Sequence, residues 1–139
     1  MKIDKNDFAS LVEMWILFEI ESAKIAAHRR TDQDILDIKN SLDAYANKVI
    51  LGEQALKEDL IFHLKIAEAT KNSILKSLIE VIRPTVFENA TQLKIYKDRH
   101  TTTVLNEHKI ILKNIIAQKS KDAGDAMRTH LKNFLVHNL

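Results

Sequence analysis

An aspartate and a histidine lie four residues apart in the stretch KEDLIFHLKIAEAT, residues 57–70, which otherwise has the apolar pattern of a buried helix. At this spacing Asp59 and His63 project from one helical face, beside Leu60 and Ile66. A carboxylate within a buried apolar stripe is costly unless a base, a cation or a metal ion compensates its charge. This pair is therefore the first candidate for a functional site.

The six histidines of the chain fall into two groups according to their place on the expected helices. Three lie at helix ends or junctions and are expected at the surface: His28, His100 and His137. Three lie on apolar stripes: His63, His108 and His130. The second group can contribute ligands to a buried site.

His108 and His130 belong to the last two expected helices, whose connecting turn centres near Lys119. At a rise of about 1.5 Å per residue both would lie roughly 16 Å from that turn, at one level of an antiparallel pair. If the helix with Asp59 and His63 packs against this hairpin, three imidazoles and one carboxylate converge. Such donors suit Zn²⁺ or Ni²⁺, with Mn²⁺ or Fe²⁺ as alternatives.

Each of these residues also has a structural explanation that needs no metal. A histidine on an apolar face is commonly a core residue with a hydrogen-bond partner, and an aspartate four residues from a histidine is commonly a simple ion pair. The matched spacing of His108 and His130 from the turn strengthens the case for a metal site, and the structural explanations stay open beside it.

The elements that must position these side chains are helices. The chain has 139 residues, 45% of them hydrophobic and 29% charged, enough for one domain with a hydrophobic core. Two glycines and one proline leave little material for hairpins, which favours long helices joined by short loops. We therefore expect an all-α fold, a single antiparallel bundle of about six helices that covers residues 1–139.

The expected helices have recognisable starts and ends. The first covers about residues 7–29, the second follows an N-cap at Thr31, and the third follows a break near residues 51–52 and ends near 70–72. The fourth covers about residues 73–98 with a kink at Pro84. The fifth follows the hydroxyl-rich residues 100–103, and the sixth begins near Ser120.

Composition excludes several classes of protein. The absence of cysteine excludes disulfides, thiol catalysis and thiolate metal sites, and a cytoplasmic location is the default expectation. No apolar run reaches the length of a membrane span, and the N-terminus lacks the apolar core of a signal peptide. A net charge of +2 is too small and too evenly spread to indicate nucleic-acid binding by this chain.

Three short motifs occur in order: DLIFHLKIAEATKN at 59–72, EHKIIL at 107–112 and GDAMRTHL at 124–131. The first expected helix adds Glu13, Glu19, Ala23, Ala26 and Ala27. With these motifs the chain resembles, from about residue 11 to 131, the FadR-type C-terminal domain (FCD) of GntR-superfamily bacterial transcription regulators. The resemblance implies a helical bundle that binds a small organic or sugar acid beside a divalent metal, in a homodimeric regulator and not an enzyme. The implied ligands are Asp59, His63, His108 and His130.

The sequence departs from the family pattern on the first helix, where Trp15 stands in place of the usual arginine. Arg83 can supply the missing cation for an effector carboxylate, the alternative being a solvent-facing arginine beside Pro84. Trp15 is an effector contact or a core residue, and Asn72 of the first motif is a third candidate for effector binding.

The family also places a winged helix-turn-helix before this domain, and the present sequence contains none. The chain is therefore expected to be a fragment or a stand-alone sensor that does not recognise an operator by itself. Two other functions compete with the sensor. One is a mononuclear metalloenzyme with Glu107 as a base, although Glu107 should point about 100° away from its neighbour His108. The other is a metal-free dimerisation module in which Asp59 and His63 form a structural pair.

Overall fold

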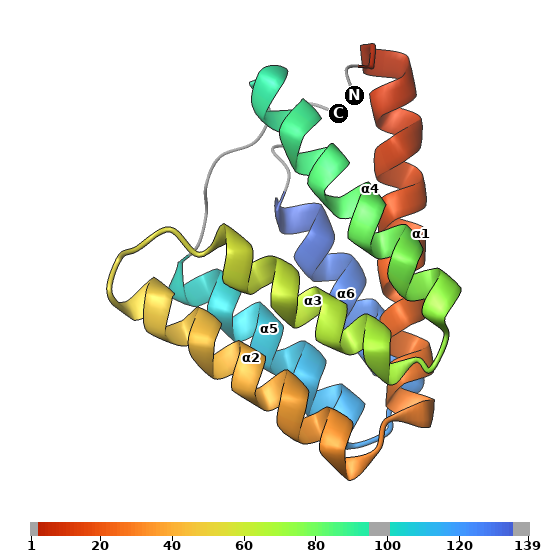
Figure 1. The fold of residues 1–139 in the computed structure, drawn as a ribbon, viewed down its shortest axis with the longest axis vertical. Helices are drawn as coiled ribbons and strands as arrows, with labels where there is room; N and C mark the ends of the chain where they lie inside the picture. Colours follow the sequence, from red (N-terminus) through yellow and green to blue (C-terminus); the bar gives the residue numbers. More distant parts are fainter. Residues whose placement is uncertain (1–2, 95–100, 135–139) are drawn as a thin grey trace.

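The computed structural model describes residues 3–94 and 101–134, and over these residues the chain is an all-α bundle of six helices without strands (Figure 1). The helices are α1 (Lys5–Arg29), α2 (Asp32–Ile50), α3 (Leu56–Ala69), α4 (Ser73–Gln92), α5 (Thr102–Ile116) and α6 (Ser120–Phe134). The fold class and the six helices predicted from the sequence are confirmed. None of these described helices combines the length and the apolar character that a membrane crossing requires.

Hydroxyl side chains set the starts of two helices where the sequence indicated them. Thr31 caps α2 by accepting from the backbone N–H of Asp34, whose carboxylate in turn accepts from the Thr31 N–H, a reciprocal capping box. Thr101 caps α5 through the N–H of Val104. These contacts satisfy backbone donors that have no partner within the helix.

Helix α4 is shorter than expected. It continues through Pro84 as one helix but ends at Gln92, before the predicted end near residue 98, and residues 95–98 lie outside the described part of the chain. Leu93 closes the helix, and Lys94 then adopts a left-handed conformation with φ of 58°. Glycine or asparagine usually marks such an end, so a lysine gave no signal in the sequence.

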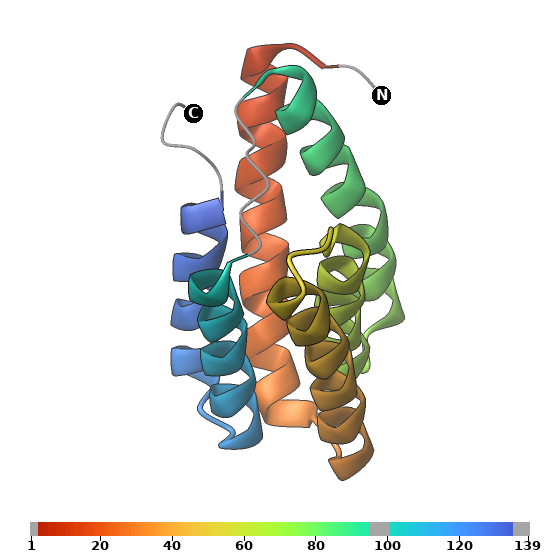
Figure 2. The ribbon, with the colours of Figure 1, turned by 90° about the vertical axis from the view of Figure 1, so that its left-hand side faces the viewer.

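Helix α1 is the element against which most of the bundle packs. Figure 2 shows it running the length of the molecule between the α5–α6 hairpin and the α3–α4 pair, and it contacts all four of these helices. Figure 1 shows α3 between α2 and α4. A buried apolar stripe extends along α1 from Phe8 to Ala27. The stripe brings α1 close to every helix that carries a candidate ligand.

Two polar contacts and one glycine fix α1 against the α5–α6 hairpin. Arg30 donates to the carbonyl of Ile116 at 2.6 Å, and the Ser120 hydroxyl donates to the carbonyl of Lys24 at 2.6 Å. At Gly124 a Cβ atom would lie 2.6 Å from Cγ of Lys24, so the two helices approach more closely than a side chain there allows. These contacts determine where α6 presents His130.

Candidate metal centre

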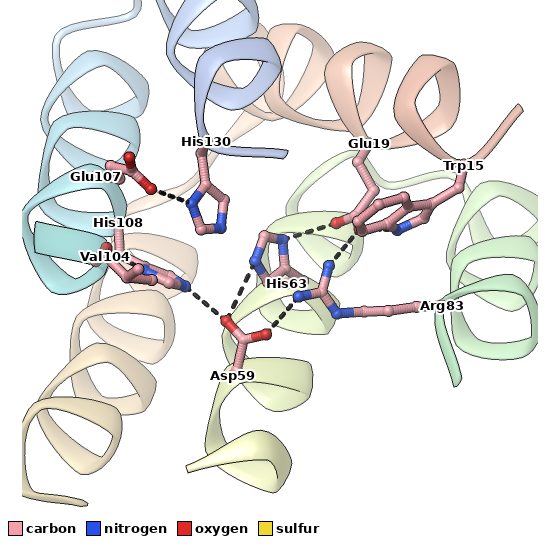
Figure 3. A network of polar contacts seen from close by, with 9 residues as sticks. All are labelled: Trp15, Glu19, Asp59, His63, Arg83, Val104, Glu107, His108 and His130. Carbon is pink, nitrogen blue, oxygen red and sulfur yellow. Dashed lines mark hydrogen bonds and ion pairs between the residues drawn. The ribbon is translucent and has the colours of Figure 1, made fainter. Parts of the chain in front are cut away.

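Four buried side chains from three helices converge at the centre of the bundle (Figure 3). Asp59 and His63 come from α3, His108 from α5 and His130 from α6, and each offers one ligand atom within 4.8 Å of all the others. None is more than 1% exposed. The structure thus brings together the four residues that the spacing selected as candidate ligands.

The histidine rings are in mutual contact across the α5–α6 hairpin. The centroids of His108 and His130 lie 4.4 Å apart, which confirms that these residues stand at one level on either side of the turn. The ring of His63 stacks on that of His130 at 5.4 Å and lies 5.5 Å from that of His108. α3 therefore packs against the hairpin as the sequence argument required.

An oxygen acceptor lies behind each histidine, on the Nδ1 side. Nδ1 of His108 donates to the carbonyl of Val104 at 2.7 Å, and Nδ1 of His130 lies 2.8 Å from Oε1 of Glu107. Nδ1 of His63 lies 2.7 Å from Oε1 of Glu19. Acceptors in these places favour a proton on Nδ1, so that Nε2 keeps its lone pair whenever the ring is neutral.

The contact between His108 and Asp59 is electrostatically unfavourable when His108 is neutral. Nε2 of His108 lies 2.7 Å from Oδ1 of Asp59, and Nε2 of His63 lies 3.5 Å from the same oxygen. Since the Nδ1 proton of a neutral His108 is directed at Val104, its Nε2 lone pair faces the carboxylate. Two acceptors at this distance repel each other, and a cation between them would satisfy both.

Arg83 occupies the other end of the cluster. It is 1% exposed, and its two terminal nitrogens contact Oε2 of Glu19 and Oδ2 of Asp59. Its guanidinium lies 4.8 Å from the ring centre of Phe87 and 5.6 Å from that of Trp15, within the range of cation–π attraction. The solvent-facing alternative for Arg83 is therefore wrong.

Trp15 is a core residue in this structure. Its side chain has no exposed surface, and its ring meets Phe87 edge to face at 5.7 Å. The indole N–H donates to Oε2 of Glu19, the oxygen that Arg83 also contacts. Trp15 thus places its polar atom on the charged end of the cluster while the ring fills the core.

The two carboxylates of this end remain ionised despite complete burial. Burial by itself would raise the pKa of Glu19, but the charges of Arg83 and His63 outweigh it and lower the pKa to about 2. Burial likewise opposes ionisation of Asp59, yet the charges of Arg83 and His63 hold its pKa well below the usual range. The end with Arg83 is therefore an assembly of paired charges.

The pKa values of the three histidines are shifted in different directions from the ordinary value. Burial and the neighbouring His108 lower the pKa of His130 to about 4, and burial also lowers the pKa of His108 although Asp59 opposes this. Burial and Arg83 act to lower the pKa of His63, but Glu19 and Asp59 outweigh them and raise it. At neutral pH His108 and His130 are neutral imidazoles, the form that binds metal ions.

Two carboxylates take part that the sequence argument did not place in the site. Glu19 belongs to the buried stripe of α1, four residues after Trp15 and four before Ala23, and that spacing was the available signal. Glu107 does not face the centre, in agreement with the expected angle from His108. It reaches across the hairpin to the outer nitrogen of His130 and accepts from Asn133 at 3.0 Å.

The structure does not bring the third effector candidate into the cluster. Asn72 is exposed in the turn between α3 and α4, where its side chain caps α4 by accepting from two backbone N–H groups. His28 is exposed at the end of α1, as expected. The other two histidines expected at the surface, His100 and His137, lie outside the described residues.

Known proteins resemble this chain over nearly its whole length. The family model of the FCD domain matches residues 10–133. The chain is 32% identical over 133 residues to the HTH-type transcriptional regulator LutR of Bacillus subtilis (strain 168), covering 93% of this chain and 61% of that protein. It is 31% identical over 124 residues to the Uxu operon regulator of Haemophilus influenzae, covering 86% of this chain and 47% of that protein. The chain thus spans about half to three fifths of the length of these curated relatives.

Solved structures show the same arrangement of helices. Streptococcus agalactiae GntR superposes with a TM-score of 0.79 at 25% identity, over 94% of this chain and 59% of that one. Escherichia coli McbR/YncC superposes with a TM-score of 0.79 at 14% identity, over 94% and 67% respectively, which supports the fold alone. The curated relatives are named as regulators of transcription, so the metalloenzyme alternative gains no support from them. This chain belongs to the FCD domain family, found in GntR-type regulators of transcription.

Proposed function

We propose that the domain is the effector sensor of a GntR-type transcription regulator and holds a divalent metal ion on Asp59, His63, His108 and His130. The observation that carries the metal is the 2.7 Å approach of Nε2 of His108 to Oδ1 of Asp59, both of them acceptors when the His108 proton is directed at Val104. A cation that binds both removes their repulsion. It also explains why a carboxylate and three imidazoles share a site from which water is excluded.

The donor set fits borderline divalent ions. Three imidazole nitrogens and one carboxylate oxygen suit Zn²⁺ or Ni²⁺, with Mn²⁺ or Fe²⁺ as alternatives. Such an ion supplies a Lewis-acidic position for a carboxylate or hydroxyl of the effector. The acceptors behind His63, His108 and His130 orient the rings and keep each Nε2 available.

The effector that we propose is a small organic or sugar acid bound beside the metal. Of the three predicted contacts, Arg83 touches the cluster directly, and Trp15 packs against its guanidinium. Because Glu19 and Asp59 already contact the two terminal nitrogens of Arg83, an effector carboxylate has to compete with them for its charge. A contact with Asn72 rests on the resemblance alone, since its side chain caps α4.

We further propose that the domain acts in the cytoplasm as a homodimer and reaches DNA only through a winged helix-turn-helix. Supporting the dimer, α1 and α4 pack side by side and carry exposed apolar side chains. These are Met14, Leu17, Ile74, Leu78 and Val81. Effector binding would then change the packing of helices that face the second subunit.

Metal analysis tests the proposal most directly. Protein purified without chelators should contain about one divalent ion per chain by elemental analysis. For metal-free protein, adding Zn²⁺ or Ni²⁺ at about 100 times the dissociation constant should raise stability by about 2.7 kcal/mol. His108→Ala should abolish both effects, and His28→Ala, which removes an exposed histidine, should preserve them. Well under one ion per chain, with no stabilisation by any of the four metals, would exclude the metal site.

One observation supports the alternative function, a dimerisation module that binds no metal. Arg83 already neutralises part of the charge of Asp59 and Glu19, so the carboxylates persist in the core without an ion. Calorimetric titration with gluconate and succinate separates the two functions. A sensor should bind one of these acids more tightly when loaded with metal, whereas the module should bind neither in either form.

A further inference from the structure

A groove of about 740 Å³ lies between the beginning of α3 and the second half of α4. Its apolar walls include Leu56 and Leu60 on one side and Pro84 and Phe87 on the other. None of the four candidate metal ligands lines it. Its volume falls within the range of ordinary small-molecule sites, and it is separate from the centre where the proposed function places the effector.

Arg83 connects this groove to the polar cluster. It lines the groove and at the same time contacts Glu19 and Asp59 through its two terminal nitrogens. Its remaining nitrogen, Nε, is buried and has no hydrogen-bond partner among the described residues. A buried N–H donor without an acceptor is rare in folded proteins and calls for a physical explanation.

The charge of Arg83 restricts what can accept from Nε. Two carboxylates already face the guanidinium, so a third anion would meet their repulsion. A neutral oxygen can accept the hydrogen bond without that cost. At the rim, Lys57 and Glu88 carry opposite charges, so the groove has no marked preference for a charged ligand.

We propose that this groove binds a small, largely apolar molecule that presents a neutral acceptor oxygen, a ketone, ester or amide carbonyl, to Nε of Arg83. The apolar body of the ligand packs against Leu60, Pro84 and Phe87, and its carbonyl satisfies the buried donor. Because the same guanidinium holds Glu19 and Asp59, occupancy of the groove changes the contacts of both carboxylates.

Trp15 reports this change without any metal. It is the one tryptophan of the sequence, and its buried indole N–H donates to the Glu19 oxygen that Arg83 also contacts. A ligand that accepts a hydrogen bond from Nε of Arg83 should therefore shift the Trp15 indole resonance. The signal does not depend on whether Asp59 and the histidines bind an ion.

The experiment compares two probes of similar size on the ¹⁵N-labelled chain of residues 1–139 by two-dimensional NMR. With 4-phenyl-2-butanone, which has a carbonyl, we expect saturable shifts of the Arg83 Nε–H, of the backbone amides of Leu60 and Phe87, and of the Trp15 indole. Saturation should fall in the millimolar range, as expected for a fragment of this size. Butylbenzene, which lacks the acceptor, should bind more weakly and leave the Trp15 indole unmoved.

Matched variants locate the binding. Leu60→Trp fills the groove and should abolish the shifts, and Thr91→Trp serves the same purpose if the first variant fails to fold. Ile110→Trp enlarges an exposed side chain on α5 and should leave them unchanged. Shifts that persist in the groove-filling variant, or the absence of saturable shifts in the unaltered protein, would overturn the site. An equal response of the Trp15 indole to butylbenzene would overturn the assignment of Nε as the donor.

Discussion

The carboxylate end of the buried cluster, formed by Glu19, Asp59 and Arg83, differs in kind from the imidazole end, formed by His108 and His130. At the carboxylate end a buried arginine contacts both acids, and their pKa values are lowered because the protein supplies the opposite charge. At the imidazole end burial lowers the pKa values, and both rings are neutral at pH 7.

This difference separates what holds the fold from what can hold a ligand. Removing one partner of a buried ion pair strands the other charge, so the bundle depends on the carboxylate end remaining paired. Neutral imidazoles with their outer nitrogens bound cost less to bury and present lone pairs to an incoming cation. His63 joins the two ends, since it contacts Glu19 on one side and stacks on His130 on the other.

The strongest way to break this comparison is to remove the cation of the carboxylate end. Arg83→Met leaves two buried carboxylates without their shared partner and should lower the free energy of unfolding by about 3–5 kcal/mol. Urea denaturation of metal-free protein measures this loss. Arg128→Met, at an exposed arginine of α6, should change stability by no more than about 0.5 kcal/mol. A loss below about 1 kcal/mol for Arg83→Met would mean that the two carboxylates do not depend on Arg83 to compensate their charge.

The imidazole end should respond in metal affinity rather than in stability. Glu107→Gln weakens the acceptor that orients His130 and should reduce metal affinity by about 10–100-fold, with little change in metal-free stability. Competition with a metal-binding dye measures the affinity. Asp125→Asn removes a nearby exposed acid that pairs with Lys121 instead of a histidine, and it should preserve the affinity. An equal loss in both variants would indicate a general charge effect.

Acidification should sharpen the comparison further. In metal-free protein, unfolded His130 gains a proton near its ordinary pKa of 6.5, whereas the folded residue does so only near 4. Since the unfolded state then binds more protons, stability should fall as the pH drops from 6.5 towards 5, by up to about 1.4 kcal/mol per pH unit for this residue. The lowered pKa of His108 acts in the same direction.

The raised pKa of His63 does not cancel this effect. Its contribution is complete below pH 6.5 and is lost at higher pH, as the pH rises through the folded pKa. Unfolding curves recorded between pH 5 and 6.5 should therefore be less pH-dependent in His130→Asn, which keeps a donor for Glu107 but cannot titrate. His28→Asn should retain the dependence of the unaltered protein, and a parallel loss of slope in both variants would contradict the assignment.

The smallest effect on the free energy of unfolding is expected at a surface ion pair. Lys71 Nζ lies 2.5 Å from Oδ2 of Asp34, with the lysine side chain 47% exposed. Lys71→Met should lower the free energy of unfolding by no more than about 1 kcal/mol, because water screens the pair. Urea denaturation in low and in high salt measures this, and the small effect should shrink further in high salt. A loss comparable to that of Arg83→Met would remove the distinction between buried and exposed charge.

Much of the fold followed from local signals in the sequence. Thr31 and Thr101 cap helices where their hydroxyls predicted them, and apolar spacing located the six helices. Symmetry about the turn near Lys119 placed His108 opposite His130. The end of α4 could not be predicted, because Lys94 adopts its left-handed conformation without the glycine that commonly signals it.

The site was predictable only in part, because some of its contacts depend on packing between distant helices. Asp59 stood out as a carboxylate in an apolar stripe, and the same test applied to α1 would have selected Glu19. No local sequence pattern predicts the contacts of Arg83 with Glu19 and Asp59. The same holds for the contact of Glu107 with His130, since each of these contacts joins two different helices. Spacing along the chain selects candidate ligands, but it does not identify the groups that orient them.

The close approach of α6 to α1 at Gly124 carries a consequence for the choice of ion. A methyl group there would require Lys24 to change rotamer or the two helices to separate, and His130 lies less than two turns further along α6. Separation would carry His130 away from Asp59 and His63 and widen the space between the donor atoms. If the proposed metal centre forms, the ionic radius that it accepts can be tuned by a residue that touches none of the candidate ligands, so metal preference could diverge among related domains that share all four.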